Sequence, residues 1–264
     1  MILSSSFLAS SSGLMNWEEI LKSLTQVKFR RADRFAHAVL SGALSCLRQH
    51  ELKEFALYFG TSNGSVESVK NSHDNISQNQ SPMPFTFINT LSSTPLFFLL
   101  QYLNMQTAAI SIAHSCFAFE NALSLSLVDL RQKRSKTAFI GVCDIWYEPL
   151  EEARKILDKN ACEFSAWIGY EYNEKDCVKF FSAFDEVLDE AARFKTKLFY
   201  VSPALAQYEM DALEKIVKIR SNDTPKTITN YSAAVICAHF TKSNSPLFYI
   251  GYDSRCGYSF VNIN

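Results

Sequence analysis

The segment from Gln106 to Asp144 constrains the fold more than any other part of the chain. Its apolar run at residues 108–113 predicts a buried strand, which leads through His114 and Ser115 into Cys116. A helical pattern of apolar residues follows and closes in a basic cluster at residues 131–136. A second apolar run at residues 137–143 predicts another buried strand. The order strand, turn, cysteine, helix, strand is typical of a packed α/β sheet.

Cys116 is the first candidate for chemistry. A cysteine in the first turn of a helix lies near unpaired N–H groups and the positive end of the helix dipole, which favour the thiolate. A structural role is the alternative, because free cysteine is among the residue types most often buried. His114 is either a hydrogen-bonded polar residue that fills a pocket or the partner of Cys116, which requires the strand to continue to the turn.

Composition indicates a globular protein in a reducing compartment. The chain has 264 residues, 47% of them hydrophobic, and a formal net charge of −1, which gives no field for nucleic acid or an anionic membrane. Its seven cysteines include no C-x-x-C pair, so we expect neither a metal site nor a redox dithiol, and a cytoplasmic location. The apolar run Pro95–Leu100 is too short to span a membrane.

Strands and helices are predicted to alternate through the first half. We expect strands near residues 2–9, 55–60, 107–113 and 137–143, and helices near 16–24, 33–49, 93–103 and 117–132. The Ser- and Asn-rich segment 61–80 is predicted to be a surface loop. The apolar run at residues 231–238 is predicted to be a strand that His239 caps. A polar break at residues 220–226 precedes two closing strands.

The first half resembles the β-ketoacyl synthases of the thiolase-like superfamily. In that family a strand ends in a nucleophilic Cys that begins a buried helix, and the next strand ends in Gly-x-x-Asp. Cys116 matches the nucleophile, Ala122-Leu123 the small–apolar pair of the helix, and Gly141 with Asp144 the strand end. Further upstream, similar segments are the opening strand with Gly13 and Trp17, the helix at 29–47, the strand at 56–64 and the Ser-Pro, Phe and Asn pattern at 81–95.

The second half departs from the family pattern. Residues 162–171 could be the strand that starts this half, and residues 180–194 its next helix. Residues 197–217 resemble the strand and loop that carry the family's first catalytic His, but contain no His. The second family His would fall near Asn230, where it is also absent. The closing segment 247–263 resembles the family's glycine hairpin, with its oxyanion turn reduced to RCGYSF.

The resemblance implies a thiolase-like α/β fold in αβαβα layers with a compressed second half. We expect an N-terminal synthase-like half at 1–158 and an abbreviated half at 159–264, which together form one compact unit. The implied site has Cys116 as the nucleophile, with His114 and the turn at Gly257 as further candidates for the catalytic machinery. The N–H groups of Cys116 and of a residue near Gly257 would form the oxyanion hole. Pocket or interface residues would be Asn89, Phe85, Phe87 and Phe117.

Two functions follow from this resemblance. The first is a chain-length-factor-like partner subunit in fatty-acid-like or polyketide-like chain assembly, weak or inactive in condensation alone, because the two imidazoles that assist decarboxylation are missing. The alternative is an acyltransferase or condensing enzyme that uses Cys116 to accept acyl groups. The implied partners are an acyl carrier protein and a full-length ketosynthase or a second copy; no cofactor is implied. The basic clusters at Arg30-Arg31 and 131–136 are each either a solvated face or a docking site for the acidic helix of the carrier protein.

Overall fold

Two five-stranded sheets form the framework of the chain. The computed structural model describes residues 1–10, 14–49, 52, 54–81, 83–146, 163–194, 197–220, 231–243 and 245–264. The first sheet has the strand order β1-β5-β4-β2-β3. Its strands are β1 (Ile2–Ala9), β2 (Ala56–Thr61), β3 (Ala109–Ala113), β4 (Thr137–Asp144) and β5 (Phe164–Glu171).

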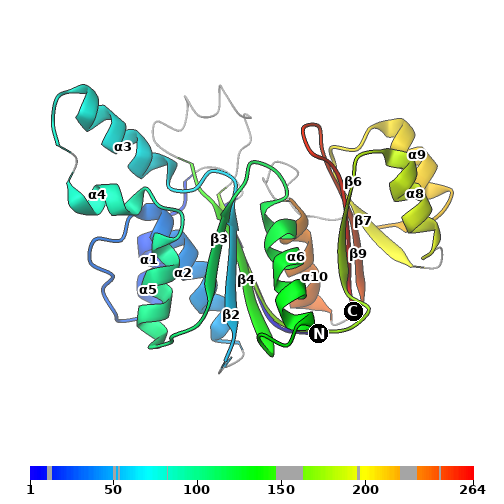
Figure 1. Cartoon of the computed structure of the whole chain (residues 1–264), viewed down its shortest axis with the longest axis horizontal. Helices are drawn as coiled ribbons and strands as arrows, with labels where there is room; N and C mark the ends of the chain where they lie inside the picture. Colours follow the sequence, from blue (N-terminus) through cyan, green and yellow to red (C-terminus); the bar gives the residue numbers. More distant parts are fainter. Residues whose placement is uncertain are drawn as a thin grey trace.

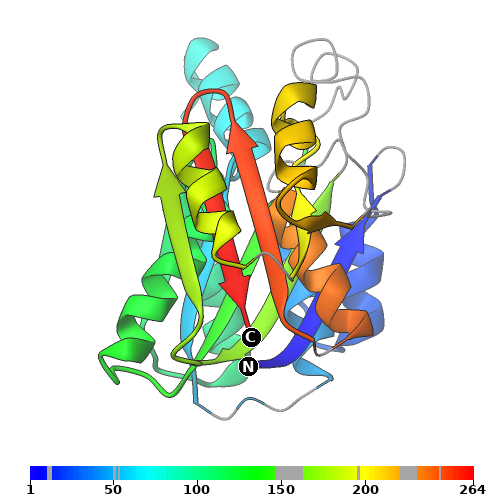
Figure 2. The same cartoon turned by 90° about the vertical axis from the view of Figure 1, so that its right-hand side faces the viewer.

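The second sheet repeats the topology of the first. Its order is β6-β10-β9-β7-β8, and when its strands are numbered within their own half, this is the order of the first sheet. The strand directions also match. In the first sheet, β5 is antiparallel to its neighbours β1 and β4; in the second, β10 is antiparallel to its neighbours β6 and β9. All other neighbouring strands in the two sheets are parallel. The strands are β6 (Cys177–Phe181), β7 (Leu198–Val201), β8 (Lys218–Ile219), β9 (Leu247–Asp253) and β10 (Gly257–Ile263). Figure 2 shows the red strand β10 between β6 and β9.

Helices complete a five-layer arrangement (Figure 1). Two central helices lie between the sheets, where α6 contacts β2 and β4, and α10 contacts β1, β5 and β9. Other helices cover the outer faces, while α3 (Val66–Ser77) and α4 (Pro84–Asn89) project at one end (Figure 1). The central helices are α6 (Ala118–Arg131) and α10 (Tyr231–Lys242). The first sheet is covered by α1 (Trp17–Leu24), α2 (Arg34–Leu47) and α5 (Thr94–Leu103), the second by α8 (Phe184–Ala192) and α9 (Gln207–Glu214). The predicted αβαβα fold is confirmed, and its second half is short, with only two residues in β8.

A buried tryptophan organises the core between the first sheet and its outer helices. The Trp167 ring stacks on Phe139 at a centroid distance of 4.7 Å and on Phe59 at 5.7 Å. A Cβ atom on Gly141 would lie 2.3 Å from this ring, and one on Gly42 would lie 2.7 Å from it. Both positions therefore require glycine because the indole occupies the space of a side chain.

Several sequence predictions differ from the structure, either in the type of element or in the sheet to which a strand belongs. The helix expected at 180–194 begins only at Phe184, because residues 177–181 form β6. The expected loop at 61–80 contains α3 (Val66–Ser77), whose Ser68 and Ser72 are buried four residues apart on one face. The expected strand at 231–238 is part of α10, which is enclosed by both sheets; a run that is apolar on all sides does not distinguish a buried strand from a buried helix. The strand expected to open the second half is β5, which lies between β1 and β4, so the sheets divide between β5 and β6.

Several sequence predictions concern residues outside the described part of the chain. These are Gly13, the residues on either side of the proposed division at 158, most of the break at 220–226, and Asn230. Within the described ranges, no helix combines the length and the apolar character needed to cross a bilayer.

Candidate functional site around Cys116

The loop that carries Cys116 leaves the edge strand β3 and enters α6. The backbone N–H of His114 donates to the Thr61 carbonyl oxygen at 3.0 Å, which extends the β2–β3 pairing by one residue beyond β3. Cys116 is buried with 4% of its surface exposed, whereas His114 is exposed. The helix begins at Ala118, so Cys116 precedes the first turn.

Asp144 anchors this loop from the end of β4. Its Oδ1 accepts hydrogen bonds from the Thr61 hydroxyl at 2.9 Å, from the Ser62 N–H at 2.7 Å and from the Asn63 N–H at 3.0 Å. The carboxylate is fully buried, and these charge-assisted bonds fix the turn that follows β2. Because Thr61 also pairs with His114, Asp144 positions the cysteine loop through β2.

The entry into α6 is shaped by close packing. A Cβ atom on Gly60 would lie 2.5 Å from the Ala118 carbonyl oxygen, so only glycine lets β2 approach the start of the helix. Phe117 has φ 54°, in the left-handed region, and its carbonyl accepts from the Asn121 side-chain amide at 2.8 Å. Its half-buried ring lies 5.9 Å from the Phe180 ring.

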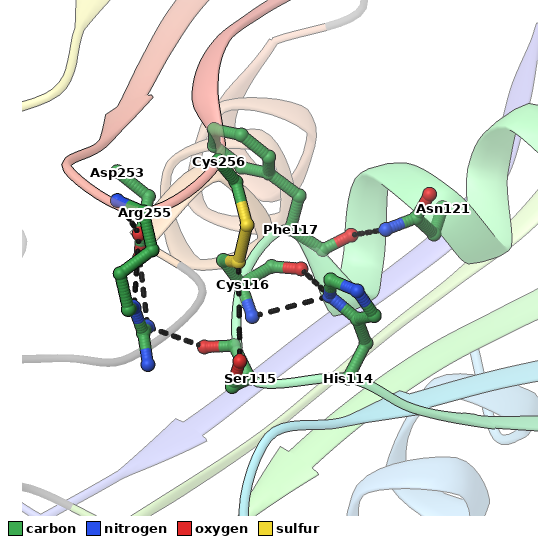
Figure 3. The surroundings of a disulfide bond; sticks show 8 residues. All are labelled: His114, Ser115, Cys116, Phe117, Asn121, Asp253, Arg255 and Cys256. Carbon is green, nitrogen blue, oxygen red and sulfur yellow. Dashed lines mark hydrogen bonds and ion pairs between the residues drawn. A yellow bond between two sulfur atoms is a disulfide. The ribbon is translucent and has the colours of Figure 1, made fainter.

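Cys116 is bonded to Cys256 in a disulfide (Figure 3). The Cα atoms are 6.6 Å apart, and the bond joins residues that are separated by 140 positions in the sequence. Cys256 lies in the exposed turn between β9 and β10. Cysteine spacing did not indicate this pair, because only the duplicated fold places the closing hairpin beside the start of α6.

Arg255 provides a second link between the same two segments (Figure 3). Its guanidinium donates to the Ser115 carbonyl oxygen at 2.8 Å and forms an ion pair with Asp253 at 2.9 Å. This ion pair holds the pKa of the Asp253 carboxyl below its usual range. The β9–β10 turn is thus attached to the cysteine loop by a hydrogen bond as well as by the disulfide.

His114 folds back onto the backbone of Cys116. Its Nδ1 lies 2.6 Å from the Cys116 carbonyl oxygen and 3.3 Å from the Cys116 nitrogen. In the described part of the chain, potential metal-ligand atoms cluster once, at His114, Cys116 and Cys256, within 4.8 Å of one another. With the two sulfurs bonded to each other, neither is a thiolate, so the oxidised cluster offers a metal only the imidazole.

The structure gives Gly257 a clear backbone role. Its φ is 82°, and an added Cβ atom would lie 2.5 Å from the Phe181 carbonyl oxygen. Both features require glycine at the start of β10. A role of Gly257 and of the Cys116 N–H in an oxyanion hole stays a prediction; here that N–H faces the His114 ring.

The predicted pocket and interface residues lie in two places. Phe117 belongs to the cysteine loop, whereas the other three belong to α4 (Pro84–Asn89). Asn89 is buried and donates to the Arg31 carbonyl oxygen at 2.8 Å. The Arg31 guanidinium lies 3.7 Å from the Phe85 ring centroid, and the Phe87 side chain is 60% exposed.

His239, the only histidine of the second half, has a structural environment. Its Nδ1 lies 3.1 Å from the Tyr200 hydroxyl, and its Nε2 lies 2.9 Å from the Ser245 carbonyl oxygen. The side chain is buried in α10, and burial lowers its pKa. It therefore ties α10 to β7 and to the residues before β9.

Glu120 is a buried acid that sequence reasoning missed. It lies in the first turn of α6, 2% exposed, and its Oε1 accepts from the Ser259 hydroxyl at 3.2 Å. Burial raises the pKa of its carboxyl. Only its four-residue spacing from Cys116 could have drawn attention to it, because glutamate in a first helical turn is ordinary.

Comparisons with known proteins identify the fold. No family model and no curated protein matches the sequence. Three solved structures each match 99% of this chain and 98% of their own chain. A ketosynthase in complex with its chain length factor from Xenorhabdus doucetiae is 12% identical with a TM-score of 0.57, and the ishigamide ketosynthase/chain length factor is 11% identical with a TM-score of 0.68. The 3-oxoacyl-[acyl-carrier-protein] synthase III from Aquifex aeolicus is 13% identical with a TM-score of 0.59. The chain has the thiolase-like fold of ketosynthase-like proteins.

Replacing Asp144 tests its anchoring role. Asp144→Asn loses the charge that receives three donors, and we expect the free energy of unfolding to fall by about 1–3 kcal/mol. Urea unfolding followed by circular dichroism measures the change. Asp189→Asn, at an exposed position of α8, is the control and should stay within about 0.5 kcal/mol of wild type. Equal effects of the two variants would remove the anchoring role.

Glu120 predicts a specific pH dependence of stability. Because its pKa is raised in the folded state, the unfolded chain releases this proton at a lower pH than the native protein does. The free energy of unfolding should therefore fall as pH rises from the ordinary carboxyl pKa to the raised one, by about 1.4 kcal/mol per pH unit. Glu120→Gln should lack this decline, and the exposed control Glu214→Gln should keep it. Parallel curves for Glu120→Gln and wild type would contradict the assignment.

Proposed function

We propose that this chain is a chain-length-factor-like partner subunit of a full-length ketosynthase in fatty-acid-like or polyketide-like chain assembly. The single observation that supports this most is an open, apolar sheet edge that leads directly into the Cys116 loop. A partner docked on that edge would lie beside the site and help to shape the space for an acyl chain.

The edge is strand β3. It pairs with β2, and its other side carries no strand in the described structure. The Leu57 N–H donates to the Ala108 carbonyl and the His114 N–H to the Thr61 carbonyl, so the even-numbered residues direct their backbone groups to β2. Ala109, Ser111 and Ala113 direct theirs to the open side. Such an edge is suited to pairing with another chain.

Exposed apolar side chains continue from this edge. Ser111 of β3 hydrogen-bonds Ser92, which lies between α4 and α5, at 3.1 Å. Large hydrophobic residues of this region are exposed by 40% or more: Met83, Phe85, Phe87, Ile88, Leu91 and Phe97. A concentration of this kind marks an interaction surface. We call it, together with β3, the β3–α4–α5 face.

Weak condensation activity is supported by the site itself. The Cys116 sulfur is bonded to Cys256, and His239, the sole histidine of the second half, is held by Tyr200 and Ser245. Decarboxylation of a malonyl group requires donors that stabilise the enolate. The exposed imidazole beside Cys116, that of His114, is directed at the backbone of Cys116.

An acyl carrier protein is the proposed acyl donor, and a basic groove favours its docking near α1. Lys28 and Arg30 line two adjoining hollows with cavity volumes of about 540 and 500 Å³, together with Val27 and Phe29. Acidic partners are steered by a few such charges. The other candidate cluster is engaged internally, since Arg131 donates to Tyr172 and Arg134 pairs with Asp129.

The partner proposal predicts which substitutions weaken association. The tagged chain would be co-expressed with each full-length ketosynthase of the source genome, and complexes would be sized by light scattering. Ala109→Pro removes an outward N–H without touching the β2 pairing, and Phe87→Ser removes an exposed ring. We expect each to weaken the heterodimer by about tenfold, or about 1.4 kcal/mol.

Matched controls separate the interface from general damage. Ala109→Ser keeps the N–H, and Tyr208→Ser removes a ring that is 69% exposed on α9. Both should bind as wild type does, with unchanged melting temperatures for all four variants. A chain that forms only homodimers, or a heterodimer insensitive to Ala109→Pro and Phe87→Ser, would contradict the proposal.

A second candidate function is acyl transfer by Cys116. It is favoured by the position of Cys116 immediately before α6, with its side chain within reach of the His114 ring. In reduced protein, the thiolate would attack an acyl thioester, form a new thioester and release the donor thiol.

Acylation can be read by intact-protein mass spectrometry. Reduced wild type would be incubated with acyl carrier protein thioesters and with small acyl thioesters, and Cys116→Ser would be run alongside. An adduct on wild type that is absent from Cys116→Ser would establish the acyltransferase reading. We expect no stable adduct on this chain, with acylation confined to its ketosynthase partner.

A further inference from the structure

We propose that Cys116 and Cys256 form a reversible dithiol–disulfide pair, oxidised by a hydroperoxide and reduced by a small dithiol, that switches Cys116 between a bonded sulfur and a free thiol. This modification site goes beyond the proposed function. Only its consequence for acyl acceptance rests on the second candidate function above.

The position of the pair favours a switch. The bond connects the loop before α6, in the first half, with the β9–β10 turn of the second half. Cys256 is exposed and Cys116 is buried, so a reagent in solution reaches one sulfur before the other. The Cα separation of 6.6 Å lies within the range that disulfides span.

The segments stay together when the bond is broken. The Arg255 guanidinium donates to the Ser115 carbonyl oxygen at 2.8 Å and pairs with Asp253, and neither contact involves a sulfur. A reduced pair is therefore kept near the geometry in which the bond forms again. The effective concentration of one thiol near the other remains high, which is the condition for ready closure.

The other described cysteines are poorly suited to oxidation. Burial raises the pKa of the Cys46 thiol to about 11 and the pKa of the Cys143 and Cys237 thiols well above the usual value. Burial also raises the pKa of Cys177, which is partly exposed. Since the thiolate is the reactive form and must be reached by the oxidant, oxidation should begin at the exposed Cys256.

Oxidation of the pair transfers two electrons from the two thiols to a hydroperoxide. The Cys256 thiolate attacks one peroxide oxygen, the O–O bond breaks, and a sulfenic acid forms while the alkoxide or hydroxide leaves and takes a proton from water. The Cys116 thiolate then attacks the Cys256 sulfur, the S–S bond forms, and hydroxide leaves and is protonated. Two thiols lose two electrons in total, and the peroxide gains them.

Reduction runs through the exposed sulfur. A dithiol attacks Cys256 Sγ, a mixed disulfide forms, and Cys116 leaves as a thiolate. The second thiol of the reductant then attacks the reductant sulfur that is bonded to Cys256, so the reductant becomes a disulfide and Cys256 leaves as a thiolate. Oxidation thus withdraws Cys116 from any acyl transfer and fastens the β9–β10 turn to the cysteine loop.

Alkylation of the native protein tests the switch without relying on acyl chemistry. Wild type would be reduced with dithiothreitol or oxidised with hydrogen peroxide, freed of reagent, and labelled with iodoacetamide in a chelator-containing buffer. Peptide mass spectrometry would report the label on Cys116 and any peptide pair joined through Cys116 and Cys256. The chelator prevents a metal on the same three side chains from protecting the thiols.

We expect Cys116 to be labelled in the reduced protein, protected and cross-linked to Cys256 after peroxide, and labelled again after a second reduction. Cys256→Ser should lose this bonded protection, and Cys177→Ser should keep it. Resistance of the bond to dithiothreitol in the native protein, or equal labelling in both states, would overturn the proposal. The comparison of reduced and oxidised wild type decides between these outcomes even if Cys256→Ser does not fold. If reduced protein is alkylated at Cys116 but is not acylated by a thioester, the result counts against acyl transfer and leaves the redox switch standing.

Discussion

The buried carboxylate of Asp144 is the contact on which the geometry of the site depends. It receives the Thr61 hydroxyl and two backbone N–H groups, and Thr61 in turn accepts from the His114 N–H. The ends of β4, β2 and β3 are thereby fixed to one another before the chain turns into Cys116. Gly60 then permits the start of α6 to approach β2. The cysteine loop is therefore held by the sheet on one side, and by the Cys256 bond and the Arg255 hydrogen bond on the other.

Particular elements show which parts of this structure can be predicted from the sequence and which cannot. Most strands and helices of the first half were predictable because their apolar runs or amphipathic patterns are clear, and Asp33 marks the start of α2 as its N-cap. The interior helix α10 was not, since an all-apolar run carries no period to distinguish helix from strand. The helix α3 was missed because its buried face is formed by serines, which are polar. These residues pack there because they are small. The pairing of Cys116 with Cys256 has no local signal, because only the tertiary fold brings together positions 140 residues apart.

The duplicated topology separates two roles in the molecule. In the inner layer, α6 carries the buried Glu120 close to the cysteine loop, and α10 carries the buried His239, which contacts Tyr200 and the Ser245 carbonyl oxygen. The β3–α4–α5 face offers the outward backbone groups of an edge strand and exposed aromatic rings, both of which a partner chain can cover. Because β3 runs directly into the Cys116 loop, binding of a partner at this face would act on the loop through adjacent residues, without long-range coupling. The proposed partner interface would thus adjoin a cysteine that is constrained by its disulfide.

Hydrogen–deuterium exchange on the chain with and without its full-length ketosynthase tests this account most directly. The account predicts that amides of residues 109–113 that face the open edge become protected in the complex, while those of the second-sheet edge strand β8 do not change. A complex in which β3 exchanges as fast as in the free chain, with protection on another face, would contradict it.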